Sequence, residues 1–128
     1  MAIESPDGKL VYFSRSPSGL FGRQNAIWRV PVAGGDEEVV VESFRSASGS
    51  WDVTAEGIYF VDERPSPSGE QWVVRFFAFG QRRAKEVALL AHPPFLDGPA
   101  VSVSYNGRWM LSTQSQGSSD LMLVEDFR

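Results

Sequence analysis

The chain of 128 residues contains 42% hydrophobic and 22% charged residues, which is the composition of one globular domain. Its net charge of −4 argues against a general phosphate-binding surface, so nucleic acid is not expected as a direct partner. Cysteine is absent, which excludes disulfides, thiolate metal sites and thiol catalysis.

Taken in chain order, the sequence predicts short strands and shows no helical periodicity long enough for a helix. Residues 1–4 are too few for a strand before the first turn. Loops rich in Ser, Gly and Pro are expected at residues 15–25 and 63–70, with a Pro-rich crossing at residues 92–99. Strands are expected at residues 10–14, 26–32, 37–42, 50–54, 57–62, 71–79, 85–91, 100–104, 107–113 and 120–126.

Targeting and membrane segments are not expected in this sequence. No apolar run approaches the roughly 20 residues that cross a bilayer, so we expect no membrane insertion. Residues 1–6 contain neither a basic segment nor an apolar stretch, so we expect no signal peptide. These features leave the compartment open.

A turn pattern recurs along the chain. It is Ser5-Pro6-Asp7-Gly8 in the first unit, Thr54-Ala55-Glu56-Gly57 in the second and Ser104-Tyr105-Asn106-Gly107 in the third. The interval is about 50 residues, which is typical of repeat architectures. Each turn ends in a glycine that can take positive φ, as a turn between two strands requires. The sequence therefore predicts three similar units.

Several predicted strands are apolar without the alternation of a half-buried strand. Residues 58–61 and 73–79 are the clearest examples. Such runs are typical of sheets covered on both faces, as in small antiparallel sheets stacked around an axis. An all-β fold with sheets packed face to face follows from this pattern.

The turn at residues 5–9, followed by the strand at residues 10–14, resembles the signature of the TolB-like, WD-repeat-like β-propeller repeat. Residues 26–35 resemble the third strand of such a blade, and residues 119–128 are similar to the end of the last blade in bacterial multidomain proteins of this type. The resemblance implies an all-β, partial β-propeller of about three four-stranded antiparallel blades. The whole chain, 1–128, is then one propeller segment, with blades near residues 1–44, 45–93 and 94–128.

The number of blades raises the question of what completes the ring. Closed propellers have 4 to 8 blades, so three blades would leave two apolar sheet faces open to association. Two arrangements remain open: a homodimer that closes a six-bladed ring, or the remaining blades of a longer parent chain. Both ends of the sequence fall within a unit, which favours the longer parent.

The resemblance implies a non-catalytic binding or scaffolding module, the sensory or protein-interaction part of a larger bacterial protein, with a protein or small ligand as partner. The alternative is an accessory propeller that gates a prolyl-oligopeptidase-like serine peptidase, whose catalytic domain lies elsewhere. We expect no enzyme activity and no cofactor in this chain, because it has no Gly-x-Ser-x-Gly elbow, His-Glu-x-x-His motif or Gly-x-x-x-x-Gly-Lys loop. His92, the only histidine, is interpreted as structural, since zinc sites and catalytic triads need partner residues.

Three loops fall at equivalent places in the units and are expected at one end of the blades. They cover residues 16–25, 66–71 and 114–119. A partner that binds at this end would meet their polar side chains. The candidate binding residues are Arg15, Arg23, Asn25, Arg64, Glu70, Gln71, Gln114 and Gln116.

The repeated turns also carry acidic or amide side chains. Asp7, Glu56 and Asn106 occupy equivalent turn positions, so they lie around one rim. They could ligate a cation on the propeller axis, or they could cap their own turns. Turn capping is the favoured interpretation, because Asn106 lacks the charge that a metal ring would need.

Two sets of basic residues complete the candidates. Arg29 and Arg75 are equivalent residues on otherwise apolar strands, and we expect each to reach the rim or to pair with a carboxylate of the next blade. Arg82, Arg83 and Lys85 form a basic cluster in a loop. The cluster could meet an acidic partner, although an ordinary solvated turn is the favoured interpretation.

Overall fold

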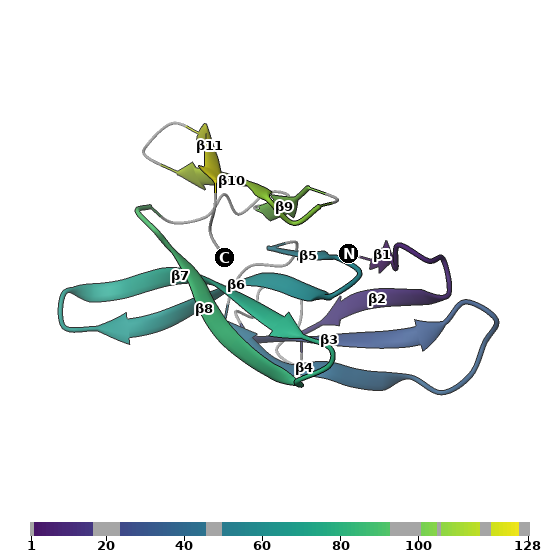
Figure 1. Cartoon of the computed structure of the whole chain (residues 1–128). Coiled ribbons are helices and arrows are strands. Elements are labelled where there is room, and N and C mark those ends of the chain that lie inside the picture. The colour runs from purple at the N-terminus through teal and green to yellow at the C-terminus, as the bar shows by residue number, and fades with distance from the viewer. Residues whose placement is uncertain are drawn as a thin grey trace.

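The computed structural model of the protein describes residues 2–16, 24–45, 50–92, 101–104, 106–115 and 119–125. In this part of the chain the regular elements are β-strands, joined by turns (Figure 1). No helix long and apolar enough to span a membrane occurs among the described residues. The all-β prediction is confirmed.

The strands form three sheets, which we call blades one, two and three. Blade one contains β1 (Ala2–Glu4), β2 (Leu10–Arg15), β3 (Gln24–Pro31) and β4 (Glu38–Arg45). Blade two contains β5 (Trp51–Val53), β6 (Gly57–Ser66), β7 (Gly69–Ala78) and β8 (Arg83–Leu90). Within the described part of blade three, the strands are β9 (Val101–Val103), β10 (Trp109–Ser115) and β11 (Ser119–Glu125).

The three blades are arranged as part of a β-propeller. Neighbouring strands within each sheet are antiparallel and follow the chain order. The first strands β1, β5 and β9 lie beside one another, and blade two stands between blades one and three (Figure 1). Small antiparallel sheets that radiate from such a line of first strands form a propeller. The partial β-propeller predicted from the sequence is therefore the observed fold.

The first strand corrects the expectation that residues 1–4 are too few to form one. β1 pairs with β2, with Ile3 opposite Tyr12. The inner strands β5 and β9 are also only three residues long. A short strand suffices at this place, because it bonds to one neighbour in its sheet and packs beside the inner strand of the next blade.

The predicted loop at residues 63–70 is in fact a β-hairpin. β6 continues to Ser66 and β7 begins at Gly69, so only Pro67 and Ser68 lie between the strands. Gly69 has a φ of 116°, and the Ser66 hydroxyl donates to its carbonyl oxygen at 2.6 Å. The Ser- and Pro-rich composition of this segment is typical of a loop, so the sequence did not indicate the strand pairing. The paired strands extend to the edge of the molecule (Figure 1).

Residues along β6 alternate between two separate apolar cores. Ile58 and Phe60 pack with residues of blade one, whereas Tyr59 and Val61 pack with residues of blade three. All four side chains are at most 2% exposed. Each fully buried apolar side chain stabilises the fold by about 1.5–3 kcal/mol. The apolar run without alternation therefore marks a strand that is covered on both faces, as the sequence predicts.

Candidate functional site

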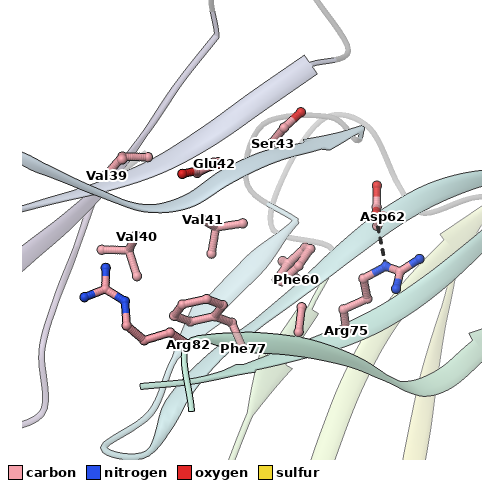
Figure 2. A pocket seen from close by; sticks show the side chains of 11 residues that line it. Val39, Val40, Val41, Glu42, Ser43, Phe60, Asp62, Arg75, Phe77 and Arg82 are labelled. Atoms are coloured by element: carbon pink, nitrogen blue, oxygen red, sulfur yellow. Dashed lines mark hydrogen bonds and ion pairs between the residues drawn. The ribbon is translucent and has the colours of Figure 1, made fainter. Parts of the chain in front are cut away.

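An open groove of about 640 Å³ lies between blade one and blade two (Figure 2). A continuous run of β4 forms one wall, and the other wall comes from β6, β7, β8 and the turn between β7 and β8. Figure 2 shows apolar side chains in the middle of the groove and charged side chains towards its ends. The lining residues are Val39, Val40, Val41, Glu42, Ser43, Phe60, Asp62, Arg75, Phe77, Arg82 and Ala84.

A β-bulge in β4 shapes the apolar part of the groove. Ile27 pairs with Val41 and Trp28 pairs with Val39, so Val40 is the extra residue between them. A bulge breaks the alternation of a strand. Val40 and Val41 are consequently both buried, at 9% and 6% exposure, although they are consecutive. Figure 2 shows both side chains between β4 and Phe77.

One end of the groove carries a network of paired charges. Asp62 Oδ2 lies 3.0 Å from Arg75 Nε (Figure 2), and Asp62 Oδ1 accepts a hydrogen bond of 2.8 Å from the Arg45 backbone N–H. Arg75 also lies 3.4 Å from Glu86, which forms a further ion pair with Arg64. The charges at this end neutralise one another, and they link β4 of blade one to the sheet of blade two.

Arg82 lies at the other end of the groove. Its backbone N–H and that of Gln81 both donate to the Ala78 carbonyl oxygen, at 2.8 and 3.2 Å. Arg82 has a φ of 52°, a left-handed conformation that is uncommon for a residue with a Cβ atom. Its exposed side chain extends towards Val40 (Figure 2).

Among the candidate residues from the sequence, the structure brings Arg64 and Gln71 together. They lie opposite each other in the β6–β7 hairpin, and Arg64 Nε and Nη2 each donate to Gln71 Oε1 at 3.2 Å. Glu70 is exposed in the same hairpin. None of these three side chains belongs to the lining of the groove, although Arg64 reaches its charged end through Glu86.

Arg15 contacts a different part of blade one. Its guanidinium lies over the rings of Phe13 and Trp28, 5.1 and 4.9 Å from their centroids, and forms an ion pair of 3.0 Å with Glu37. Such stacking holds an arginine against an apolar sheet face. Asn25 is 3% exposed. The structure therefore does not gather Arg15 and Asn25 with Arg64 and Gln71 into one site.

The remaining candidates give less information. The backbone of Gln114 lies in β10, opposite Asp120 of β11. Arg23 and Gln116 lie outside the described residues. The binding role of the eight candidates stays a prediction. Sequence reasoning missed the valines of the groove wall, because the groove exists only where two blades meet.

The turns before β2 and β10 are capped by their own side chains. The Ser5 hydroxyl donates to Asp7 Oδ1 at 2.6 Å, and the Lys9 N–H donates to the same oxygen at 3.0 Å. In blade three, Ser104 and Asn106 repeat this arrangement with bonds of 2.8 and 3.0 Å to Asn106 Oδ1. Hydrogen bonds from the Ser5 hydroxyl and the Lys9 N–H lower the pKa of Asp7.

Glu56 does not occupy an equivalent place, because the turn of blade two is shorter. Thr54 Oγ1 donates to the Gly57 carbonyl oxygen at 3.1 Å, and the Thr54 N–H donates to the same oxygen at 2.8 Å. In the part of the chain that the structure describes, no group of three or more His, Asp or Glu side chains could hold a metal ion. Capping is therefore the role that Asp7 and Asn106 have in the structure.

Arg29 and Arg75 occupy equivalent places, but they pair within their own blades. Arg29 lies opposite Glu38 of β4, and Arg75 lies opposite Glu86 of β8; each pair forms a salt bridge. The expected pairing with the next blade is therefore wrong. The sheet register places each arginine directly across from a glutamate of its own blade, within reach of an ion pair. Arg75 has a second carboxylate of its own blade, Asp62, at 3.0 Å.

A second hollow of about 260 Å³ lies where the inner parts of the three blades meet. Apart from the carboxylate of Glu56, its lining consists of short polar side chains and aliphatic groups. The lining residues are Pro6, Val53, Thr54, Ala55, Glu56, Val103 and Ser104.

No protein-family model matches the sequence, and no curated protein matches it either. Among solved structures, TolB from Acinetobacter baumannii is similar, with a TM-score of 0.57 and 15% sequence identity. The match covers 91% of this chain and 28% of the TolB chain, so this chain spans less than a third of that protein. At this identity the likeness shows the fold alone. Together with the three radiating blades, it shows that the chain has a TolB-like β-propeller fold, here as a partial propeller.

Proposed function

We infer that this chain is a non-catalytic protein-interaction module of a larger bacterial protein, and that the groove between blades one and two receives an extended segment of its partner. The TolB-like fold supports a propeller-type interaction module. Because the match covers only part of TolB, further blades complete the ring in this proposal, from the same protein or from a second copy. No comparison favours the peptidase-gating alternative.

The observation that carries the proposal is the make-up of the groove. Apolar side chains from two blades, including Val41, Phe60 and Phe77, line its middle, and charged side chains lie at both ends (Figure 2). Protein interfaces have this anatomy, with an apolar centre and a polar rim. The volume of about 640 Å³ is enough for several side chains of a peptide.

The strand that forms one wall also offers backbone groups. β4 is the last strand of its sheet, so among the described elements one of its edges has no neighbouring strand. An extended peptide can add to such an edge, where main-chain hydrogen bonds give affinity and side-chain hollows give specificity. The groove runs along β4 through five consecutive residues, 39–43.

The network of paired charges at one end of the groove also supports recognition rather than proton transfer. Asp62 is held by Arg75 and by the Arg45 backbone, and Glu86 is held by Arg64 and Arg75. A general acid or base must exchange its proton with the reacting group. Carboxylates fixed between arginines are better suited to hold the shape of a binding surface.

The test is to select short random peptides that bind the protein and to measure their affinity for two variants. Ala84→Trp fills the groove from an exposed strand position, and Ser68→Trp places the same side chain on the β6–β7 turn. We expect Ala84→Trp to weaken binding by about tenfold or more, because interface centres carry most of the affinity. Ser68→Trp should bind like the wild type. Peptides that bind both variants equally would exclude the groove as the site.

A further inference from the structure

We propose that the partner segment in the groove is acidic, and that Arg82 binds one of its carboxylates while Arg83 and Lys85 bind those that follow. This inference rests on the proposed function, since it names the chemistry of the partner in the same groove. The sequence indicates a basic cluster that could meet an acidic partner, but it favours an ordinary solvated turn. The structure adds three observations. They are the backbone conformation of Arg82, the lack of carboxylate partners for the three residues, and the position of the cluster between the groove and a separate hollow.

The backbone of Arg82 is the first observation. Arg82 has a φ of 52°, a conformation that is sterically unfavourable for a residue with a Cβ atom but not for glycine. The corresponding turn of blade one, between β3 and β4, uses Gly34 and Gly35 at its positive φ values of 95° and 142°. Blade two has an arginine in the strained conformation instead. Residues held in such conformations cluster at functional sites.

The second observation concerns charge. Among the described residues, Arg82, Arg83 and Lys85 make no ion pair with a carboxylate. Two carboxylates of the same blade are paired with other arginines, Asp62 with Arg75 and Glu86 with Arg64 and Arg75. The protein carries a net charge of −4, so this corner is a local exception. A partner that complements the charge of this corner is therefore negatively charged.

The third observation is the position of the cluster. Arg82 and Ala84 line the groove on one side of β8. Arg83, Ala84 and Lys85 line a separate hollow of about 290 Å³ on the other side, together with Phe76, Ala78 and Gln81. Arg83 and Lys85 are alternate residues of β8 and so share one face of the strand, while Ala84 between them borders both the groove and the hollow. A segment that leaves the groove beside Arg82 reaches Arg83 and Lys85 across the β7–β8 turn.

The hollow beside Arg83 and Lys85 has an apolar side as well. The ring of Phe76 stacks on Tyr59, with 4.5 Å between centroids, and so forms a fixed surface beside the two cations. A free phosphate would use only the cations. A peptide in which carboxylates alternate with apolar side chains would use both the cations and the aromatic surface, and we therefore commit to an acidic peptide rather than an inorganic anion or a nucleic acid.

The experiment measures the fluorescence anisotropy of a short labelled peptide of alternating glutamate and valine, with an alternating lysine and valine peptide as its counterpart. We expect Arg82→Gly to weaken binding of the acidic peptide by about tenfold, because a charge-assisted contact is lost. Arg82→Lys, which keeps the charge, should retain most of the affinity. Arg108→Gln, at an exposed arginine of blade three, is the matched control and should bind like the wild type.

Thermal unfolding separates recognition from folding in these variants. Arg82→Gly should unfold at the same temperature as the wild type or higher, since glycine relieves the left-handed strain. Loss of binding in a variant of undiminished stability would support the assignment. Unchanged binding by Arg82→Gly, equal binding of the lysine peptide, or displacement of the acidic peptide by inorganic phosphate at the same concentration would each overturn it.

The proposed function can fail separately from this inference. If random peptides depend on the groove, as tested by Ala84→Trp, but carry no excess of acidic residues, the groove binds peptides and the acidic assignment is wrong. If Ala84→Trp changes nothing while Arg82→Gly abolishes binding of the acidic peptide, the anion site is real and the groove is not the peptide site, which overturns the inference as stated.

Discussion

Asp62 on β6 and Arg45 at the end of β4 are joined across the boundary between blades one and two by a hydrogen bond of 2.8 Å, from the Arg45 backbone N–H to Asp62 Oδ1. The other carboxylate oxygen of Asp62 accepts from Arg75 at 3.0 Å. The side chains of Asp62 and Arg75 are only 20% and 25% exposed. One carboxylate therefore connects the outer strand of one blade to the sheet of the next.

We expect Asp62→Ala to lower the free energy of unfolding by about 1–3 kcal/mol, because the Arg45 N–H and the Arg75 guanidinium each lose an acceptor. The midpoint of urea unfolding measures this. Glu42→Ala removes an exposed carboxylate of the neighbouring strand and should change stability by no more than about 0.5 kcal/mol. Equal midpoints for the two variants would show that the link between the blades contributes little.

Asp52 on β5 forms a comparable link from blade two to blade three. Its Oδ2 accepts a hydrogen bond of 2.8 Å from the Val103 N–H on β9, and its Oδ1 accepts from the Val53 N–H at 2.9 Å. Burial raises the pKa of Asp52, and the two N–H donors oppose that rise. The inner strands of the two blades are thus bridged by a partly desolvated carboxylate.

The raised pKa of Asp52 sets the direction of a pH effect. Because the folded state binds the proton more tightly than the unfolded state, the stability linked to Asp52 is greatest below the unfolded-state pKa and declines as the pH rises through the folded-state pKa. Asp52→Asn cannot titrate, so the free energy of unfolding should lose this decline when it is measured by urea unfolding from acid to neutral pH. The same pH dependence in the variant and the wild type would contradict the assignment.

Asp7 should show the opposite pH effect. Its pKa is lowered, so its contribution to stability is present above the unfolded-state pKa and is lost as the pH falls through the folded-state pKa. Asn106 accepts equivalent bonds in blade three without a charge. We therefore expect Asp7→Asn to keep the turn at neutral pH and to remove the loss of stability that Asp7 causes in acid. Thermal unfolding at neutral pH and at a pH below the folded-state pKa of Asp7 measures both effects. Asp7→Ala, which has no side-chain acceptor, should be less stable than the wild type at both pH values. If Asp7→Asn destabilised the protein as much as Asp7→Ala at neutral pH, the hydrogen bonds to the side chain of residue 7 would not explain the turn.

The repeat and the burial of the strands could be predicted from the sequence because both depend on local patterns. The Ser-x-Asp or Ser-x-Asn turn places its side-chain acceptor two residues after the hydroxyl, and the structure shows these bonds at Asp7 and Asn106. Arg29 and Arg75 were also predicted correctly to be equivalent, because residues at the same position of a repeat occupy the same position in the corresponding strand. Their partners depend on register, which the repeat alone does not specify.

The groove could not be predicted, because no single segment contains it. It depends on the bulge at Val40 and on side chains that two separate sheets contribute. The acceptor role of Asp62 towards the Arg45 backbone was also hidden, since a backbone N–H has no sequence signal. In the same way, nothing in the residue type of Arg82 indicates a left-handed backbone, so a strained arginine and an ordinary solvated turn look alike in the sequence.

The glycines of the repeat are present for two different physical reasons. Gly8 and Gly107 have φ values of 72° and 68°, the left-handed turn that the sequence predicts, but Gly57 does not share that conformation. A Cβ atom at Gly57 would overlap the Phe77 carbonyl oxygen and lie 2.6 Å from a ring carbon of Phe76. Close approach of β7, rather than the turn, therefore requires glycine in blade two.

Gly57→Ala should consequently destabilise the protein by at least the roughly 1–3 kcal/mol that is typical of an overpacked core, because one of the obstructing atoms belongs to the backbone. Gly80→Ala is the matched control, since a Cβ atom there meets nothing within 4 Å and its backbone is not left-handed. It should leave stability unchanged or raise it by about 0.4–1 kcal/mol. Urea unfolding of both variants measures the difference. Equal midpoints would mean that β6 and β7 can separate enough to admit a methyl group, and the close approach would then not explain why glycine stands at this position.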